Sequence, residues 1–308
     1  MNKVSYQRFA LGVLLACVAV IVWGAYVRAS GSGAGCGSHW PLCNGVLLPQ
    51  TEAQKTWIEF SHRLSSGLLL VLVGGLAAWA WKIFPSGSFA LRVAVTAFVA
   101  VLLEALIGAF LVLLRLVEHD QSVLRVISIS LHLVNTLFLL AALTCAYLSA
   151  GELAPRWSFP SGQRLWPRGL ILGFAALGAL GAVAALGDTL FPPSSVLAGI
   201  ALDLSGTGHV AERIRVLHPL LAVGWVGAFA WWVSALWERF PSLKKQGMRT
   251  LSLACGNLLL GLCNILFLAP VSLQMLHLLV ADALWISFVA LLFSAASRWQ
   301  REPISGTS

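Results

Sequence analysis

The chain has 308 residues, of which 58% are hydrophobic and only 10% carry a charged side chain. Soluble globular domains carry about 25% charged residues, so the composition excludes that class and indicates a protein embedded in a lipid bilayer. The formal net charge of +8 does not indicate a nucleic-acid partner, because most basic residues flank one side of the predicted membrane segments.

Eight apolar stretches are each long enough to cross a bilayer, which takes ~20 residues of α-helix. They cover residues 8–28, 57–82, 89–115, 122–149, 168–187, 211–237, 248–270 and 272–297. The sequence therefore predicts an all-α membrane protein with eight transmembrane helices. Two long connecting segments, 29–56 and 188–210, are rich in Gly and Pro, and loops of that length are usually functional or disordered.

The distribution of lysine and arginine orients the predicted helices. Segments with the excess of basic residues stay in the cytoplasm, which places both termini there. The first apolar run is longer than the core of a signal peptide, and no Arg- and Ser-rich transit segment precedes it. We therefore expect this helix to be retained in a bacterial plasma membrane.

The eight predicted helices form two similar halves. His62 in the second helix matches His218 in the sixth, and His132 in the fourth matches His277 in the eighth. A repeat that keeps its order and topology is related by an axis along the membrane normal, so we expect two pseudo-symmetric four-helix bundles. The expected parts are a first bundle, a Pro-rich cytoplasmic linker and a second bundle, at residues 1–150, 151–167 and 168–308.

These four histidines are the main functional signal, because ionisable residues inside a membrane are expensive and mark functional sites. At 1.5 Å per residue, all four lie roughly 8–15 Å from the outer ends of their helices. Two imidazoles that face each other across a bundle at matched depth form a bis-histidine haem site. Zinc fits less well, since no Cys, Asp or Glu completes a closed set of four ligands.

A single histidine on an apolar helix face is more often a core residue than a ligand, but four of them paired by a repeat favour ligation. The remaining histidines lie in predicted outer loops, where we expect solvated side chains: His39, His119 and His209.

The two halves differ three residues before the first histidine of each pair, where one has Glu59 and the other has Arg215. This spacing places each residue on the same helix face as its histidine. Arginine pairs with carboxylates, so Arg215 suits the propionates of a permanently bound haem. Glu59 would repel propionates and either moves protons or caps its helix. The sequence thus predicts chemistry in the first half, where Arg63 and Arg125 are candidates to hold the propionates of a haem substrate.

Other polar residues near the histidines have two interpretations each. Glu104, deep in the third helix, either packs as a structural acid or relays protons. Asn135, Gln274 and Asp282 either bond an imidazole N–H or join helices.

Two of the six cysteines, Cys36 and Cys43, lie in the first outer loop, where an oxidising compartment permits a disulfide. Such a bond either rigidifies the loop or takes part in redox chemistry. The other four cysteines fall within helices, where apolar packing is their expected role.

Together, these residues resemble the haem A synthase family. The resemblance covers most of the chain and rests on the eight spans, the Glu59-x-x-His62-Arg63 motif, the loop that ends at Cys43-Asn44-Gly45, and the other three helix histidines. It implies that His218 and His277 ligate a low-spin haem b, that His62 and His132 hold the substrate haem O, and that Glu59 is catalytic. The Cys36–Cys43 pair resembles the disulfide of one variant of the family.

The resemblance implies oxidation of the C8 methyl group of haem O to a formyl group, by two hydroxylations and loss of water, for cytochrome oxidase assembly. It also implies an electron donor, which the sequence does not identify, and it allows a complex with haem O synthase. Two other functions fit a protein with paired haem ligands. One is a di-haem b electron-transfer subunit, and the other is a haem transporter or chaperone. The position of all four histidines toward the outer face disfavours the electron-transfer subunit.

Overall fold

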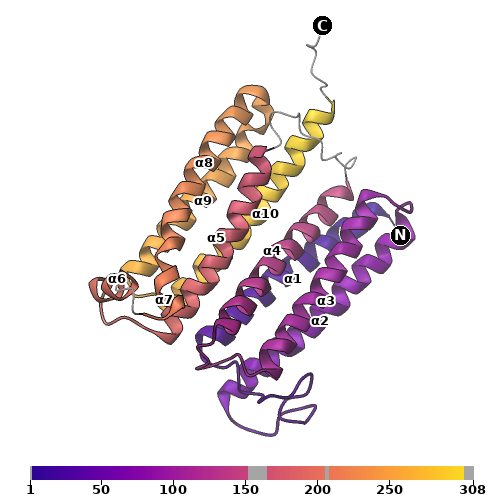
Figure 1. The fold of residues 1–308 in the computed structure, drawn as a ribbon. Helices are drawn as coiled ribbons and strands as arrows, with labels where there is room; N and C mark the ends of the chain where they lie inside the picture. The colour runs from indigo at the N-terminus through magenta and orange to yellow at the C-terminus, as the bar shows by residue number, and fades with distance from the viewer. Residues whose placement is uncertain (1, 152–164, 205–207, 302–308) are drawn as a thin grey trace.

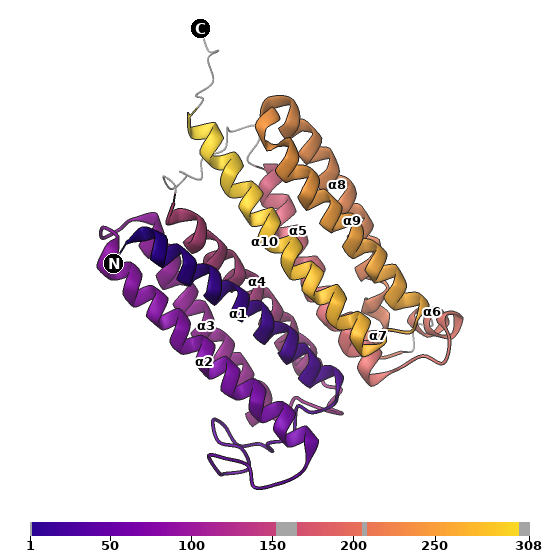
Figure 2. The same cartoon turned by 180° about the vertical axis from the view of Figure 1, so that it is seen from behind.

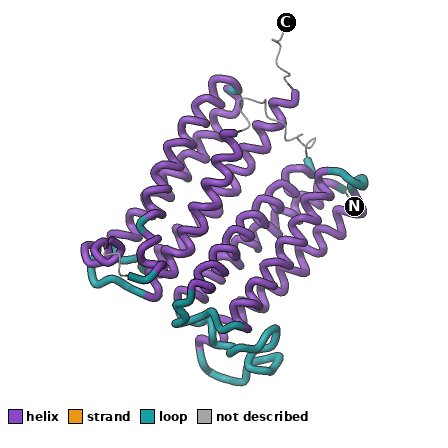
Figure 3. The backbone as a smooth tube through the Cα atoms, in the orientation of Figure 1, coloured by secondary structure: helices purple, strands orange, loops and turns teal. Residues whose placement is uncertain are grey.

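The computed structural model describes residues 2–151, 165–204 and 208–301, and within these ranges it contains helices and no strand (Figures 1 and 3). The helices are α1 (Lys3–Ala29), α2 (Gln54–Ile83), α3 (Phe89–Leu113), α4 (Val123–Ser149), α5 (Leu165–Leu190), α6 (Val196–Leu204), α7 (Val210–Arg215), α8 (Leu217–Arg239), the 3₁₀ helix η2 (Pro241–Leu243), α9 (Lys244–Leu266) and α10 (Val271–Arg301). Most of the predicted linker, 151–167, lies outside the described residues.

Eight of these helical segments are long and apolar enough to cross a membrane, which confirms the predicted number. Helices suit this environment because a helix satisfies its own backbone hydrogen bonds where no water is present. The sixth span is interrupted at Val216, between α7 and α8. Pro219 explains the interruption, because its ring clashes with the carbonyl group of residue 215 in a continuous helix.

The helices lie in two groups, α1–α4 and α5 with α8–α10 (Figures 1 and 2). In the first group, α1 packs on α2 and α4, and α3 packs on α2 and α4. In the second, α8 packs on α5 and α9, and α9 packs on α10. The groups meet where α4 contacts both α5 and α10 and where α1 contacts α10. This arrangement is compatible with the predicted pair of pseudo-symmetric bundles.

The apolar core runs through both groups without a break. In α3, small side chains allow close helix packing, since Ala90, Ala94, Ala97 and Ala100 are all buried. Between the groups, Trp285 Nε1 of α10 donates a hydrogen bond to the carbonyl oxygen of Leu137 in α4, at 2.7 Å. The two groups are therefore joined by buried contacts along their length.

The ends of the two groups differ in content. One end, here called the loop end, carries residues 30–53, α6 and α7, whereas α1 begins and α10 finishes at the other (Figures 1 and 3). The segment 30–53 is irregular, as expected. The segment 188–210 departs from the prediction of an unstructured loop, because it contains the nine-residue helix α6.

Candidate functional site

In the second half, His218 of α8 and His277 of α10 face each other with ring centroids 6.3 Å apart and ring planes at 82°. His218 Nδ1 lies 3.1 Å from the carbonyl oxygen of Leu177. A carbonyl can only accept, so Nδ1 carries the proton and Nε2 keeps its lone pair for a ligand. Metal–imidazole bonds are about 2 Å long, so this spacing suits one metal atom between the rings. The donor set therefore fits a bis-histidine haem.

Three of the imidazoles pack against glycine backbone. A Cβ atom added to Gly24 in α1 would lie 2.8 Å from Cε1 of His62, and one added to Gly181 in α5 would lie 2.8 Å from Cε1 of His218. One added to Gly261 in α9 would lie 3.3 Å from Cε1 of His277. The contact of Gly24 with His62 in the first half is equivalent to that of Gly181 with His218 in the second half. The similarity between the halves therefore includes these two glycines.

Substitution Gly181→Ala should displace the His218 imidazole, because the added Cβ atom leaves the ring less space than van der Waals contact requires. Loss of a group that orients a metal ligand costs about 10–100-fold in metal affinity, and we expect a comparable loss of haem binding. Haem titration of purified protein measures the effect. Gly169→Ala in the same helix is the matched control, since no atom lies within 4 Å of its added Cβ atom. Equal haem affinity in both variants would contradict the expectation.

In the first half, His132 of α4 contacts a carboxylate. Its Nδ1 contacts Oε2 of Glu104 in α3, and Oε1 of Glu104 accepts a 2.7 Å hydrogen bond from Thr136 Oγ1. A carboxylate on one ring nitrogen fixes the tautomer and orientation of a metal-binding histidine. The His62 ring of α2 packs against Gly24 of α1. The structure thus gives Glu104 a specific contact that its position in the sequence did not predict.

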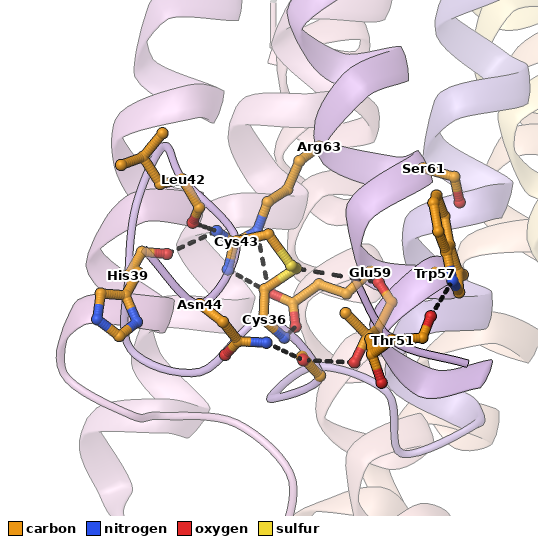
Figure 4. The surroundings of a disulfide bond; sticks show 12 residues. Cys36, His39, Leu42, Cys43, Asn44, Thr51, Trp57, Glu59, Ser61 and Arg63 are labelled. Atoms are coloured by element: carbon orange, nitrogen blue, oxygen red, sulfur yellow. Dashed lines mark hydrogen bonds and ion pairs between the residues drawn. A yellow bond between two sulfur atoms is a disulfide. The ribbon is translucent and has the colours of Figure 1, made fainter. Parts of the chain in front are cut away.

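Glu59, one helical turn before His62 in α2, contacts the loop that the disulfide closes (Figure 4). Its side chain is buried, and Oε2 accepts a 2.8 Å hydrogen bond from the backbone N–H of Cys36. Oε1 accepts a 3.0 Å bond from Arg63 Nε and also pairs with Arg63 Nη2. Glu59 is not a helix cap, since the first turn of α2 contains no acidic residue. The expected disulfide between Cys36 and Cys43 is present.

The arginines that the sequence assigns to propionates have protein partners. Arg63 Nη1 donates to the carbonyl oxygens of His39 and Leu42 at 2.6 and 2.7 Å. Arg125 Nη1 donates to the carbonyl oxygens of Glu118 and Asp120 at 2.7 and 2.6 Å. Both side chains therefore hold loop backbone, which disfavours the predicted role in substrate binding for Arg63. Arg125 Nε is buried without a hydrogen-bond partner among the described residues, so a role for Arg125 stays a prediction.

Arg215 forms two ion pairs, with Asp203 of α6 at 2.6 Å and with Asp188 of α5 at 3.3 Å. Burial raises the pKa of the Asp203 carboxyl group, and the Arg215 guanidinium opposes that rise. Among the described residues, Arg215 Nη2 is buried without a hydrogen-bond partner. A buried donor of this kind is costly unless it is bonded, so Nη2 suits one further acceptor such as a propionate.

Of the other polar residues near the histidines, Asn135 and Gln274 join helices. Asn135 Nδ2 donates to the carbonyl oxygen of Ala100 in α3 at 2.9 Å. Gln274 Oε1 in α10 accepts a 3.0 Å bond from Arg28 Nη2 in α1. Asp282 is buried, and its Oδ2 has no hydrogen-bond partner among the described residues.

His209 was expected to be a solvated residue, but it caps α7. Its Nδ1 accepts a 3.1 Å hydrogen bond from the backbone N–H of Ala211. Its Nε2 lies 2.7 Å from the carbonyl oxygen of Gln121, which belongs to the first half. His39 and His119 are exposed, as predicted.

Comparison with known proteins assigns the sequence to a family. The sequence model of the COX15-CtaA family, described as cytochrome oxidase assembly protein, matches residues 7–289. The chain belongs to this family.

Named relatives are similar to this chain over different shares of its length. A protein of Thermus thermophilus named protoheme IX farnesyltransferase is 43% identical over 296 residues, which are 94% of this chain and 48% of that protein. Heme A synthase of Geobacillus kaustophilus is 43% identical over 105 residues, 34% of this chain and 33% of that protein. Heme A synthase of Alkalihalophilus pseudofirmus is 40% identical over 100 residues, 32% of each chain. The chain thus spans about half the length of the Thermus relative.

Proposed function

We propose that this protein is a haem A synthase that oxidises the C8 methyl group of haem O to a formyl group. The observation that carries the proposal is the difference between two similar histidine pairs. In the first half, Glu104 contacts the His132 ring, and Glu59, which is paired with Arg63, stands one helical turn before His62. In the second half, Arg215 precedes His218 and is paired with two carboxylates. A carboxylate in contact with a histidine suits a reactive site, and a buried guanidinium with an N–H group left unbonded suits the propionate of a fixed cofactor. Similarity to named haem A synthases supports the assignment.

In this proposal, His218 and His277 hold haem b, and Nη2 of Arg215 binds a propionate. Bound haem supplies the one-electron redox chemistry that side chains lack. His62 and His132 hold the substrate haem O. Glu104 fixes the His132 ring through Nδ1, and Glu59 accepts and releases protons beside the substrate. The Cys36–Cys43 loop covers Glu59 and limits the access of water to it.

We also propose that the loop end faces outward and that both termini are cytoplasmic, because the basic residues and the disulfide both favour this orientation. After reduction, a membrane-impermeant maleimide should label Cys36 and Cys43 in intact cells. Labelling that requires disrupted cells would contradict the orientation.

The source of the substrate follows from its chemistry. Haem O carries a prenyl-derived chain, so a reaction that transfers a farnesyl group to protohaem must precede this one. The Thermus relative supports a close connection between the two reactions, since it is named for that transfer and one half of its length is similar to this chain. We propose that a haem O synthase delivers haem O to this protein. We also propose that dioxygen is the oxidant for the two hydroxylations and that a separate donor supplies the electrons they consume.

Pigment extraction tests the activity against the alternatives. Cells that produce haem O and this protein under aerobic conditions should accumulate haem A, identified by the mass and spectrum of its formyl group. The His62→Ala variant, produced at an equal level, is the control. Bound haem without any formyl product would instead support a di-haem electron-transfer subunit or a haem carrier.

A further inference from the structure

Arg63 joins three parts of the first half: helix α2, the disulfide loop and the Glu59 carboxylate (Figure 4). Its Nε and Nη2 both bond Oε1 of Glu59, one helical turn away. Its Nη1 bonds two loop carbonyl oxygens, those of His39 and Leu42. The side chain is only 12% exposed, so these contacts lie largely out of water. Charge-assisted hydrogen bonds in such surroundings are stronger than neutral ones.

The second carboxylate oxygen of Glu59 is fixed from the other side. Cys36, which is itself buried and bonded to Cys43, donates its backbone N–H to Oε2. Asn44 and Thr56 add bonds to the carbonyl oxygen of Gly35 at 3.3 and 2.8 Å. The loop therefore contacts Glu59 directly through Cys36 and indirectly through Arg63.

Four hydrogen bonds to protein acceptors occupy most of the five N–H groups of the Arg63 guanidinium. We propose that Arg63 is a positioning residue: it orients the Glu59 carboxylate and docks the disulfide loop over the His62 site. It acts through Glu59 and the loop rather than by binding a substrate. This inference deepens the proposed function and rests on Glu59 being the reactive acid.

The docking role is tested on purified protein without haem. The rate of reduction of the Cys36–Cys43 bond by a water-soluble phosphine is followed by the mass gain from two additional maleimide labels. Reduction of a buried disulfide requires local opening, so loss of the Arg63 contacts should raise the rate about tenfold or more in Arg63→Gln. Arg115→Gln, which changes an exposed arginine at the end of α3, should leave the rate unchanged. An unchanged rate in Arg63→Gln overturns the proposal.

Arg63→Lys is a second test variant, which keeps the proposal testable if Arg63→Gln does not fold. Lysine can pair with Glu59 but lacks the planar fork that also reaches two carbonyl oxygens. We expect faster reduction with circular dichroism equal to that of the wild type. Wild-type reduction kinetics in the lysine variant would mean that the loop contacts are not needed, which contradicts docking by Arg63.

The role in orienting Glu59 is tested by a double-mutant cycle on haem A formation. Arg63→Gln should lower kcat more than it raises KM in the wild-type background and should cause no further loss in the Glu59→Gln background. If the double variant instead loses kcat by the product of the two single losses, Arg63 acts independently of Glu59, and the proposal that Arg63 orients Glu59 is overturned. If the wild type forms no haem A, the proposed function fails, but the reduction rates still decide whether Arg63 docks the loop.

Discussion

Replacing His218 by alanine should remove the proposed low-spin haem b from the purified protein. His218 has its Nδ1 fixed by the carbonyl oxygen of Leu177 and its ring centroid 6.3 Å from that of His277. Loss of an outer-shell partner alone costs about 10–100-fold in metal affinity, so loss of the ligand itself should cost more. The measurement is haem content with the optical spectrum of the reduced protein.

The matched variant is His62→Ala, which should retain the haem b spectrum and lose only the turnover of haem O. Loss of haem b in His62→Ala, with retention in His218→Ala, would exchange the roles of the two halves.

Glu59→Gln should lower the formation of haem A by at least about 100-fold, the lower limit typical for loss of a general acid or base. Glutamine has nearly the same shape as glutamate but cannot carry a proton between partners. Its NH₂ group must also face either Arg63 or the Cys36 N–H, and both are donors. Haem A extracted per amount of protein measures the effect, and haem b content should stay constant.

Glu52→Gln is the control for this variant, since Glu52 is an exposed acid just before α2. Wild-type formation of haem A by Glu59→Gln would disprove the proton role and leave Glu59 as a structural partner of Arg63.

The sequence predicted the fold well where one physical rule dominates. The eight spans follow from long apolar runs, and the four histidines are within nine residues of the loop end of their spans, as their positions indicated. Helix α6 was missed because Pro192 and Pro193 precede it in a segment rich in glycine. The interruption at Val216 was missed, although Pro219 is a sufficient signal for it.

The neighbours of the candidate site were harder to predict, because they depend on residues distant in the chain. Arg63 meets loop carbonyl oxygens of residues 39 and 42, and Arg215 meets Asp188 and Asp203. Hydrophobic periodicity gives no information about such pairs. Gly24 and Gly181 could have been found, since they stand 157 residues apart (24 to 181), close to the 156 that separate His62 from His218.

The bond from Arg28 to the second half has a consequence for how the two halves evolved. Arg28 Nη1 donates to the carbonyl oxygen of Ala185 at 2.6 Å, and the glycine repeat makes Ala185 the counterpart of Arg28 itself. Arginine at both positions would bring two like charges together in a region of low dielectric constant. With alanine on one side, the halves are complementary rather than identical. A homodimer of either half would lack this bond or double its charge, so this contact requires two different halves in one molecule.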